Sequence, residues 1–238
     1  MKLKKNIVAL IAARKNSKGI KNKNLLKINN QSIVKKAVQI GLKIRSIDHL
    51  ILSSDSQDIL DLVKNNKKIL KIKRKSKLAR DNTPMLPVIQ DAIKIFEKVS
   101  KKKISYIILL DPTSPFRLKK DIDRAIKIIK KKKLDLIVSV NEPEHNPYFS
   151  IMEKKGYYYS LSKGTNLNVG SRQEAKKVFN INTVVWIYSR RAIMQIKKRI
   201  PYKTDIIIID EERSIEINTK KDLLKIKNFL KGKVWEKF

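Results

Sequence analysis

Short apolar segments alternate with amphipathic segments through the first 140 residues, and this alternation constrains the fold more than any other feature of the sequence. Residues 7–13, 104–110 and 134–140 are almost continuously apolar, as strands are when helices cover both faces of a parallel sheet. Between such segments, apolar residues recur at helical spacing, for example at Val34, Ala37 and Val38. The sequence therefore predicts an α/β fold, with a mainly parallel sheet and helices on both faces. Further strands are expected at residues 50–52, 69–72, 184–188 and 206–209, and further helices after Ile59, at 87–99, at 121–129, near Arg191 and at 219–230.

Residues 141–180 interrupt this alternation. They combine turn-forming residues with a cluster of aromatic side chains, so we expect hairpins and loops in this segment. The aromatic side chains either pack against a second surface or belong to an ordinary exposed hairpin. At 238 residues, the chain is most simply one domain, residues 1–238, with 141–180 as an excursion. The residues behind this interpretation are Pro143, Pro147, Gly156, Gly164 and Gly170, with Tyr148, Phe149, Tyr157, Tyr158 and Tyr159 between them.

The composition is strongly basic, with 56 Lys and Arg against 22 Asp and Glu and a formal net charge of +34. Such a balance is typical of proteins that bind nucleic acid or another anionic surface. Here, however, the lysines are spread along the whole chain together with many Ile and Asn residues, which favours codon bias in an AT-rich genome. Only 6% of the residues are aromatic, and no nucleic-acid recognition motif is present, so we expect no specific nucleic-acid partner.

Other classes of protein are disfavoured by what the sequence lacks. The absence of cysteine excludes disulfides and thiolate metal sites, and two histidines make a histidine-based zinc site improbable. No apolar run approaches the roughly 18 residues that a membrane span needs. We therefore expect a cytoplasmic protein with no membrane partner.

A basic loop follows the first predicted strand. Residues 14–23 carry five cations among small residues that include Ser17 and Gly19. A loop of this kind at the carboxyl end of a parallel strand can hold phosphate, because backbone N–H groups and cations converge on one anion. The spacing fits neither a P-loop nor a dinucleotide-binding G-x-G-x-x-G motif. The alternative is a plain surface loop in a lysine-rich protein.

Three predicted strands end in polar residues, at 14–23, 53–55 and 111–117, and the motifs at two of these ends carry a family resemblance. Residues 13–25 match the pattern A-R-x-x-S-K-G-x-x-x-K-N-L, and residues 112–117 match P-T-S-P-[LF]-R. The chain thereby resembles the acylneuraminate cytidylyltransferases, or CMP-sialic acid synthetases. Weaker matches run in the same order over nearly the whole chain: residues 78–81 (L-A-R-D) to L-A-x-D, 171–173 (S-R-Q) to R-R-Q, Asn182 to R-x-N-G and 214–219 (S-I-E-I-N-T) to S-I-D-I-D-T.

The resemblance implies a Rossmann-like nucleotidyltransferase fold and a CTP-dependent reaction, in which the anomeric hydroxyl of an acidic sugar attacks the α-phosphate and pyrophosphate leaves. Catalysis of such a reaction consists mostly of positioning and of cations that stabilise the charge on the phosphoryl oxygens. The resemblance also implies a homodimer formed through residues 141–180. It assigns catalytic contacts to Arg14 and Lys23, nucleotide binding to Ala13, Arg14, Ser17, Lys23, Asn24, Arg74 and Asp81, and sugar binding to Asp111, Thr113, Arg172, Gln173 and Asn182. Among these, Arg172 is expected to pair with the sugar carboxylate.

The predicted Mg²⁺ site departs from the family pattern. Glu216 and Asn218 replace the two aspartates that hold the metal in relatives, so one formal charge is lost. Asp111 stands where the sialic acid enzymes usually have Gln, and we hypothesise that it restores this charge, so that Asp111, Glu216 and Asn218 hold the metal. Two alternatives stay open: Asp111 hydrogen-bonds a sugar substituent, and Asn218 caps the last helix.

Two other functions remain compatible with the sequence. One is a degenerate relative that binds a nucleotide without transferring it, which the changes at Glu216 and Asn218 motivate. The other is a basic nucleic-acid-binding protein. It predicts a contiguous basic face and binding that survives moderate salt, whereas scattered charge predicts rapid loss of binding with salt.

Overall fold

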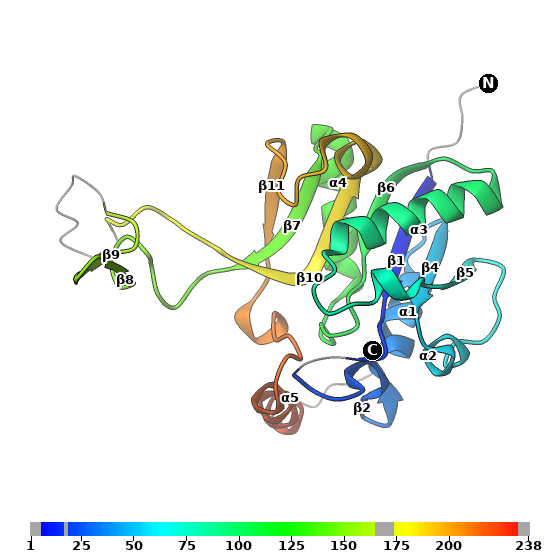
Figure 1. Ribbon diagram of the computed structural model, residues 1–238, viewed down its shortest axis with the longest axis horizontal. Helices are drawn as coiled ribbons and strands as arrows, with labels where there is room; N and C mark the ends of the chain where they lie inside the picture. The colour runs from blue at the N-terminus through cyan, green and yellow to red at the C-terminus, as the bar shows by residue number, and fades with distance from the viewer. Residues whose placement is uncertain (1–5, 17–18, 165–173, 233–238) are drawn as a thin grey trace.

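The computed structural model describes residues 6–16, 19–164 and 174–232, and a seven-stranded sheet forms its centre (Figure 1). Six strands of this sheet are mutually parallel, and β10 runs antiparallel between β7 and β6. The mainly parallel sheet predicted from the sequence is therefore confirmed. In spatial order, the strands are β11 (Thr204–Ile208), β7 (Leu136–Asn141), β10 (Asn180–Ser189), β6 (Ile104–Leu109), β1 (Asn6–Ala12), β4 (His49–Ser54) and β5 (Ile69–Lys73).

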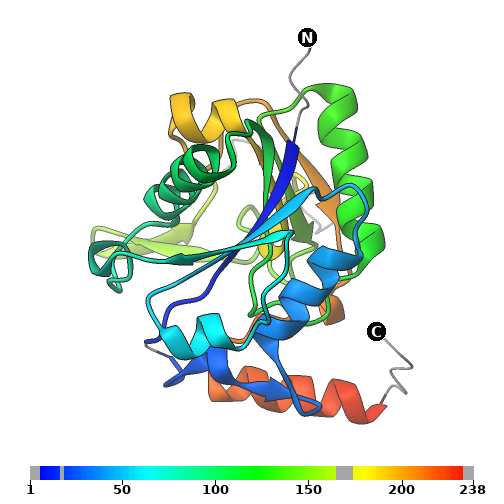
Figure 2. The same cartoon turned by 90° about the vertical axis from the view of Figure 1, so that its right-hand side faces the viewer.

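Helices cover both faces of the sheet, as Figure 2 shows. The apolar stripes of α1, α2 and α4 pack on one face, and α3 packs on the other together with the π-helical turn η3. The helices are α1 (Ile33–Lys43), α2 (Gln57–Asp61), α3 (Met85–Ser100), α4 (Lys119–Lys132) and α5 (Lys220–Gly232), and the short turns are η1 (Lys23–Leu25), η2 (Ser76–Leu78), η3 (Ala192–Ile196) and η4 (Glu211–Arg213).

Strand β1 shows why residues 7–13 are almost continuously apolar. Successive side chains of a strand point to opposite faces, and both faces are covered here. Ile7, Ala9 and Ile11 join the core under α1, α2 and α4, whereas Val8 and Leu10 join the core under α3. All five are at most 2% exposed, and burial of a large aliphatic side chain contributes about 1.5–3 kcal/mol.

A third apolar cluster attaches the C-terminal helix to the start of the chain. Phe229 of α5 packs edge-on against Phe116, with ring centroids 4.7 Å apart, and Ile226 and Ile217 join the same cluster. Ile28, in the small sheet formed by β2 (Lys27–Ile28) and β3 (Gln31–Ser32), belongs to the same cluster. The segment before α5 is thereby held close to the basic loop, although the two are far apart in the sequence.

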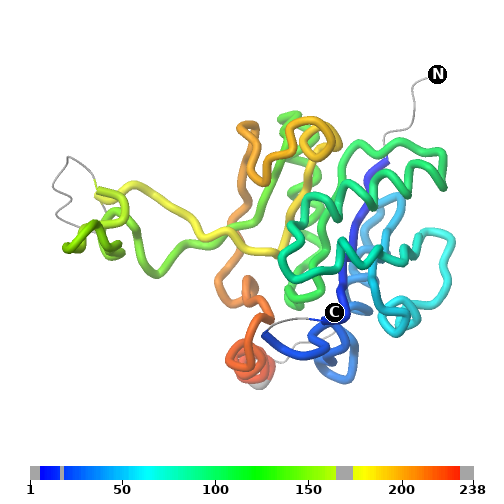
Figure 3. Tube along the Cα trace, in the orientation of Figure 1, coloured from blue at the N-terminus to red at the C-terminus, as the bar shows by residue number. Residues whose placement is uncertain are grey.

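The predicted excursion contains an antiparallel hairpin of β8 (Met152–Lys155) and β9 (Tyr158–Leu161). The chain leaves the sheet after β7 and returns in β10, so that the hairpin projects away from the main body (Figures 1 and 3). Gly156, at its tip, has a φ of +63°, which favours glycine over residues with a side chain. Tyr157, Tyr158 and Tyr159 are 95%, 80% and 65% exposed.

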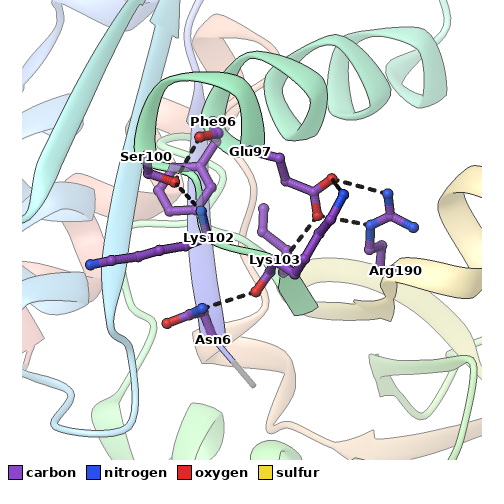
Figure 4. Close-up of polar contacts among 8 residues, drawn as sticks. Asn6, Phe96, Glu97, Ser100, Lys102, Lys103 and Arg190 are labelled. Atoms are coloured by element: carbon purple, nitrogen blue, oxygen red, sulfur yellow. Dashed lines mark hydrogen bonds and ion pairs between the residues drawn. The ribbon is translucent and has the colours of Figure 1, made fainter. Parts of the chain in front are cut away.

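A polar cluster lies at the amino ends of the parallel strands, at the opposite end of the sheet from the predicted site (Figure 4). Glu97 of α3 accepts hydrogen bonds from Arg190 Nε and Nη2 at 2.8 and 3.0 Å, and from the backbone N–H of Ile104 at 3.0 Å. Burial alone would raise the pKa of Glu97, but the bonds from Arg190 and Ile104 outweigh it, so its pKa is lowered. This carboxylate joins α3, β6 and the end of β10.

No helix in the described ranges 6–16, 19–164 and 174–232 combines the length and the apolar character needed to cross a bilayer.

Candidate active site

A cleft of about 510 Å³ opens at the carboxyl ends of β1 and β6, where ligands bind in open parallel sheets. Its walls come from four parts of the chain: the basic loop after β1, residues 74–88, the start of the loop after β6, and the segment before α5. Cations and carboxylates both face it. The predicted site residues that line it are Arg14, Lys23, Asn24, Arg74, Asp81, Asp111, Thr113, Glu216 and Asn218.

The basic loop is held in shape by backbone contacts and one buried amide. The N–H of Ala13 donates to the carbonyl of Ser53 at 3.0 Å, which continues the parallel pairing of β1 with β4. Asn24 is 6% exposed, and its Nδ2 donates to the carbonyl of Arg14 at 2.8 Å. The N–H of Lys15 donates to Asp55 Oδ1 at 2.8 Å. Asn24 therefore shapes the loop, while its neighbour Lys23 contacts Asn218.

The basic loop touches the segment before α5. A Cβ atom on Gly19 would lie only 2.1 Å from the carbonyl oxygen of Asn218, so only glycine allows this approach. Lys23 Nζ donates to Asn218 Oδ1 at 3.2 Å from the same loop. Together, these contacts place a cation beside the predicted metal ligands.

An ion pair spans another wall of the cleft. Arg14 Nη1 lies 2.7 Å from Asp81 Oδ1, and both side chains are partly exposed, at 27% and 45%. Arg74 lies deeper: its Nη2 donates to the Ser53 carbonyl at 2.7 Å and its Nε to the Ser53 hydroxyl at 3.2 Å. Burial lowers the pKa of Arg74, with Asp55 opposing this effect and Arg14 adding to it. Arg74 thus braces the end of β4, while Arg14 carries the more accessible charge.

Two carboxylates meet at the far side of the cleft. The Thr113 hydroxyl lies 2.8 Å from Asp111 Oδ1 and 3.3 Å from Glu216 Oε1, so both carboxylates share one donor. The N–H of Ile217 donates to the Thr113 carbonyl at 2.9 Å and fixes the segment before α5 against the loop after β6. Burial, followed by the charge of Asp111, raises the pKa of Glu216, while bonds from Asn218 and Thr113 and the charge of Lys23 act in the opposite direction.

Asn218 does not cap α5. The helix begins at Lys220, and Thr219 and Asp222 cap it reciprocally: Asp222 N–H approaches Thr219 Oγ1 at 3.4 Å, while Thr219 N–H donates to Asp222 Oδ2 at 2.6 Å. The side chain of Asn218 instead accepts from Lys23. The capping interpretation of Asn218 was therefore wrong, and its side-chain oxygen faces the cleft.

Several predicted residues lie elsewhere. Asn182 is buried outside the cleft lining, where its Oδ1 accepts from Ser139 Oγ and its carbonyl accepts from Trp186 Nε1. Ala13 is fully buried, and its neighbour Ala12 lines the cleft. Ser17, Arg172 and Gln173 lie outside the described residues.

The cleft also contains residues that the sequence reasoning did not single out. Arg80, within the L-A-R-D motif, adds a cation to the cleft. The family pattern L-A-x-D does not identify this residue, because it allows any residue at that position. Leu78, Thr83, Met85 and Val88 supply a largely apolar wall. No pattern in the sequence identifies Thr83, Met85 and Val88, whose place beside the cleft depends on the turn into α3 and on its first residues.

The comparisons with known proteins agree with this geometry. Residues 8–228 match the family model described as cytidylyltransferase. The chain is 29% identical over 224 residues to the CMP-N,N'-diacetyllegionaminic acid synthase of Campylobacter jejuni, and 28% identical over 224 residues to the post-translational flagellin modification protein B of Campylobacter coli. Each alignment covers 94% of both chains.

Among solved structures, CMP-2-keto-3-deoxy-manno-octonic acid synthetase in complex with CTP superposes with a TM-score of 0.67 at 12% identity, covering 95% of this chain and 99% of that one. Because the two sequences are only 12% identical, this superposition is evidence for the fold alone. It agrees with the Rossmann-like architecture expected from the sequence motifs. The family match extends over nearly the whole chain, including every wall of the cleft. The chain therefore belongs to the cytidylyltransferase family.

Proposed function

We propose that this cytidylyltransferase transfers the cytidylyl group of CTP to an acidic sugar of the nonulosonic class, such as a sialic or legionaminic acid. The observation that carries the proposal is the cleft itself, in which Arg14 and Lys23 face the carboxylates of Asp111 and Glu216. A phosphoryl transfer needs cations for the triphosphate and oxygen ligands for a metal ion, and both are present. The two relatives named above come from organisms of one genus, and one of them is named for making a CMP-activated nonulosonic acid.

In the proposed reaction, the anomeric hydroxyl of the sugar attacks the α-phosphorus of CTP. A sugar–phosphate bond forms, the bond between the α- and β-phosphates breaks, the hydroxyl loses its proton, and pyrophosphate leaves with the bonding electrons. When CTP binds, the guanidinium of Arg14 leaves Asp81 and pairs with a phosphate oxygen. The exchange is feasible because the Arg14 side chain is partly exposed and a phosphate is an anionic acceptor like the Asp81 carboxylate. Lys23 of the same loop lies beside Asn218, and its ammonium would stabilise charge that develops on the phosphates.

The residues at the far side of the cleft fit Mg²⁺. Asp111 and Glu216 supply carboxylate oxygens around the shared Thr113 hydroxyl, and Asn218 supplies an amide oxygen beside them. Mg²⁺ prefers such hard oxygen ligands and is commonly bound by one or two carboxylates together with substrate phosphates. When bound, the metal would neutralise charge on the phosphates. Among the residues that the structure describes, no group of three or more Asp, Glu, His or Cys side chains is arranged to hold a metal ion, so the proposal needs the substrate to complete the coordination.

The projecting hairpin supports a homodimer, in which residues 141–180 of one chain pack against the other. Its exposed side chains are unusually apolar for a surface: Tyr157, Tyr158 and Met152 are 95%, 80% and 61% exposed. Aromatic residues of this kind are enriched at the centres of interfaces. Recognition of the sugar carboxylate is proposed for Arg172, which lies in the same excursion.

The test is a pyrophosphate-release assay with CTP and Mg²⁺, run against sialic, legionaminic and pseudaminic acids and KDO, with ATP, GTP and UTP as controls. Release that requires CTP and a nonulosonic acid supports the proposal. No release with any sugar, from folded protein that still binds CTP, contradicts it and favours a nucleotide-binding relative without transfer activity.

A further inference from the structure

A second cavity, of about 550 Å³, lies between α1 and the start of α4. One wall is a stripe of α1 that includes Lys36, Ala37 and Ile40. The opposite wall is formed by Pro112, Ser114, Pro115 and residues 117–120. The loop after β6 separates this cavity from the active-site cleft. Asp111 and Thr113 of this loop line the cleft, whereas Pro112, Ser114 and Pro115 line the cavity. The two cavities are therefore distinct and share one loop as their wall.

The charged side chains that line the cavity are all basic. The lining contains five basic side chains, and no Asp or Glu is among the described residues that form it. Lys119 is partly neutralised by Asp123, whose Oδ2 lies 2.6 Å from its Nζ. The other four are Lys36, Lys43, Arg117 and Lys120. The size of the cavity falls within the range of small-molecule sites, about 300–1,000 Å³.

Arg117 is a buried cation whose partners here are all neutral. It is 5% exposed; its Nε donates to the Val184 carbonyl, and its Nη2 donates to the carbonyls of Asp111 and Thr183 at 3.0 and 3.1 Å. Within residues 6–16, 19–164 and 174–232, no carboxylate forms an ion pair with Arg117, and Nη1 has no hydrogen-bond acceptor. Burial lowers the pKa of Arg117 to about 10, with Asp111 and Asp121 opposing the shift, so the group is charged at neutral pH.

Lys36 provides a second poorly hydrated cation on the facing wall. It is half-buried on α1, and burial lowers its pKa. No hydrogen bond or ion pair joins it to another residue in the described part of the chain. Buried charges in proteins are normally paired, because the loss of hydration is otherwise not offset. An anion bound in this cavity would therefore offset the lost hydration of Arg117, which is buried, and of Lys36, which is half-buried.

We propose that the cavity between α1 and α4 is a second ligand site, which binds an organic anion by its charged group at Arg117 and Lys36 and by its apolar body against Ala37 and Ile40. A carboxylate, phosphate or sulfonate group would satisfy the same donors. The apolar wall favours a ligand with a hydrocarbon or aromatic body over an inorganic ion. The assignment is independent of the reaction in the cleft, because none of these four residues lines the cleft.

The first test is a fluorescence titration with 8-anilino-1-naphthalenesulfonate, a sulfonate on an aromatic body, in the presence of saturating CTP. Lys36→Glu is compared with Lys35→Glu, which makes the same charge change on an exposed neighbour that does not line the cavity. We expect Lys36→Glu to weaken dye binding at least tenfold and Lys35→Glu to change it less than twofold. Equal effects of the two substitutions would overturn the proposal. So would dye binding that is seen without CTP and is lost at saturating CTP.

A second measurement does not depend on the fold tolerating a charge reversal. The chain contains no cysteine, so Gln39→Cys introduces a single thiol at an exposed residue that lines the cavity. The dye should slow modification of this thiol by a maleimide at least fivefold and leave the Lys35→Cys control unchanged. An unchanged rate at Gln39→Cys, or equal protection at both positions, would contradict a ligand site here.

Discussion

Gly19 lies against the backbone carbonyl of Asn218, so closely that a Cβ atom at residue 19 would approach the Asn218 oxygen to 2.1 Å. This contact joins the basic loop to the segment that carries the proposed metal ligands. Lys23 reaches Asn218 from the same loop, across a sequence separation of 195 residues. The relative position of the two sides of the cleft, for which phosphate binding and metal binding are proposed, therefore depends on one glycine.

Gly19→Ala should impair catalysis more than it impairs stability. The added methyl group must push the loop away from Asn218, and a displacement of about 1 Å at a catalytic group can cost about 100-fold in rate. We expect kcat/KM for CTP to fall by about 10- to 100-fold. Gly164→Ala is the matched control, because a Cβ there meets nothing within 4 Å. Equal activity of the two variants would show that the contact is not needed.

Arg14→Ala should weaken the use of CTP. The guanidinium is proposed to exchange Asp81 for a phosphate oxygen, and a charge-assisted hydrogen bond contributes about 1.5–3 kcal/mol. Steady-state kinetics should then show a loss of about 10- to 100-fold in kcat/KM for CTP. Arg45→Ala removes an exposed arginine outside the cleft and should leave the kinetics unchanged. A wild-type value of kcat/KM for Arg14→Ala would exclude the proposed role.

The metal proposal predicts opposite effects for two substitutions. Asp111→Asn removes a carboxylate and should raise the Mg²⁺ concentration needed for half-maximal activity about tenfold, whereas Asn218→Asp adds one and should lower it. The measurement is a Mg²⁺ titration at saturating substrates. Should Asp111→Asn change the sugar preference and leave the Mg²⁺ requirement unaltered, Asp111 would be a sugar ligand instead.

Glu97 should make the protein sensitive to acid. Its pKa is lowered in the folded state, so its contribution to stability is complete above the unfolded value near 4.5 and is lost as the pH falls through the folded value. Glu97→Gln should therefore reduce the free energy of unfolding by about 1–3 kcal/mol at pH 7, and by less at pH 3.5. Denaturant unfolding at both pH values measures this difference.

The control for this experiment is Glu153→Gln, because the Glu153 carboxylate lies in an exposed ion pair, 3.8 Å from Lys155 Nζ. Such a pair contributes little to stability. A loss of stability for Glu97→Gln that is the same at pH 7 and pH 3.5 would rule out the carboxylate charge as its source.

The proposed dimer predicts that the hairpin determines the oligomeric state. Tyr158→Ser removes an 80% exposed aromatic side chain, and aromatic residues at the centre of an interface often contribute 2 kcal/mol or more, so dissociation should occur at higher protein concentration. Light scattering after size exclusion gives the mass. Tyr202→Ser removes a fully exposed tyrosine outside the hairpin and serves as the control. A monomeric wild-type protein would refute the proposal.

The sheet could be predicted because its strands are buried on both faces. Residues 7–13 and 104–110 have no exposed face and are therefore almost continuously apolar, and β1 and β6 lie there in the structure. Strand β10 was underestimated: it begins at Asn180 rather than at residue 184, because its first residues extend toward the hairpin and include polar side chains. Its antiparallel direction follows from tertiary connectivity and has no local signal in the sequence.

The site could be predicted only in part. Arg14, Lys23 and Asp81 lie in recognisable motifs, and the structure brings them to one cleft. The identity of the capping residue could not be predicted, because Thr219 and Asn218 are both good helix caps. In the structure, Thr219 Oγ1 approaches the N–H of Asp222, whereas Asn218 Oδ1 accepts from Lys23, which is remote in the sequence.

The central claim is tested most directly by identifying the product. The protein is incubated with CTP, Mg²⁺ and N,N'-diacetyllegionaminic or N-acetylneuraminic acid, and the mixture is analysed by mass spectrometry together with a pyrophosphate assay. Cytidylyl transfer should give a CMP-linked sugar and pyrophosphate in equal amounts, and both should require the acidic sugar. Pyrophosphate without a CMP-sugar would indicate hydrolysis of CTP, and together with full activity of Arg14→Ala it would contradict cytidylyl transfer in this cleft.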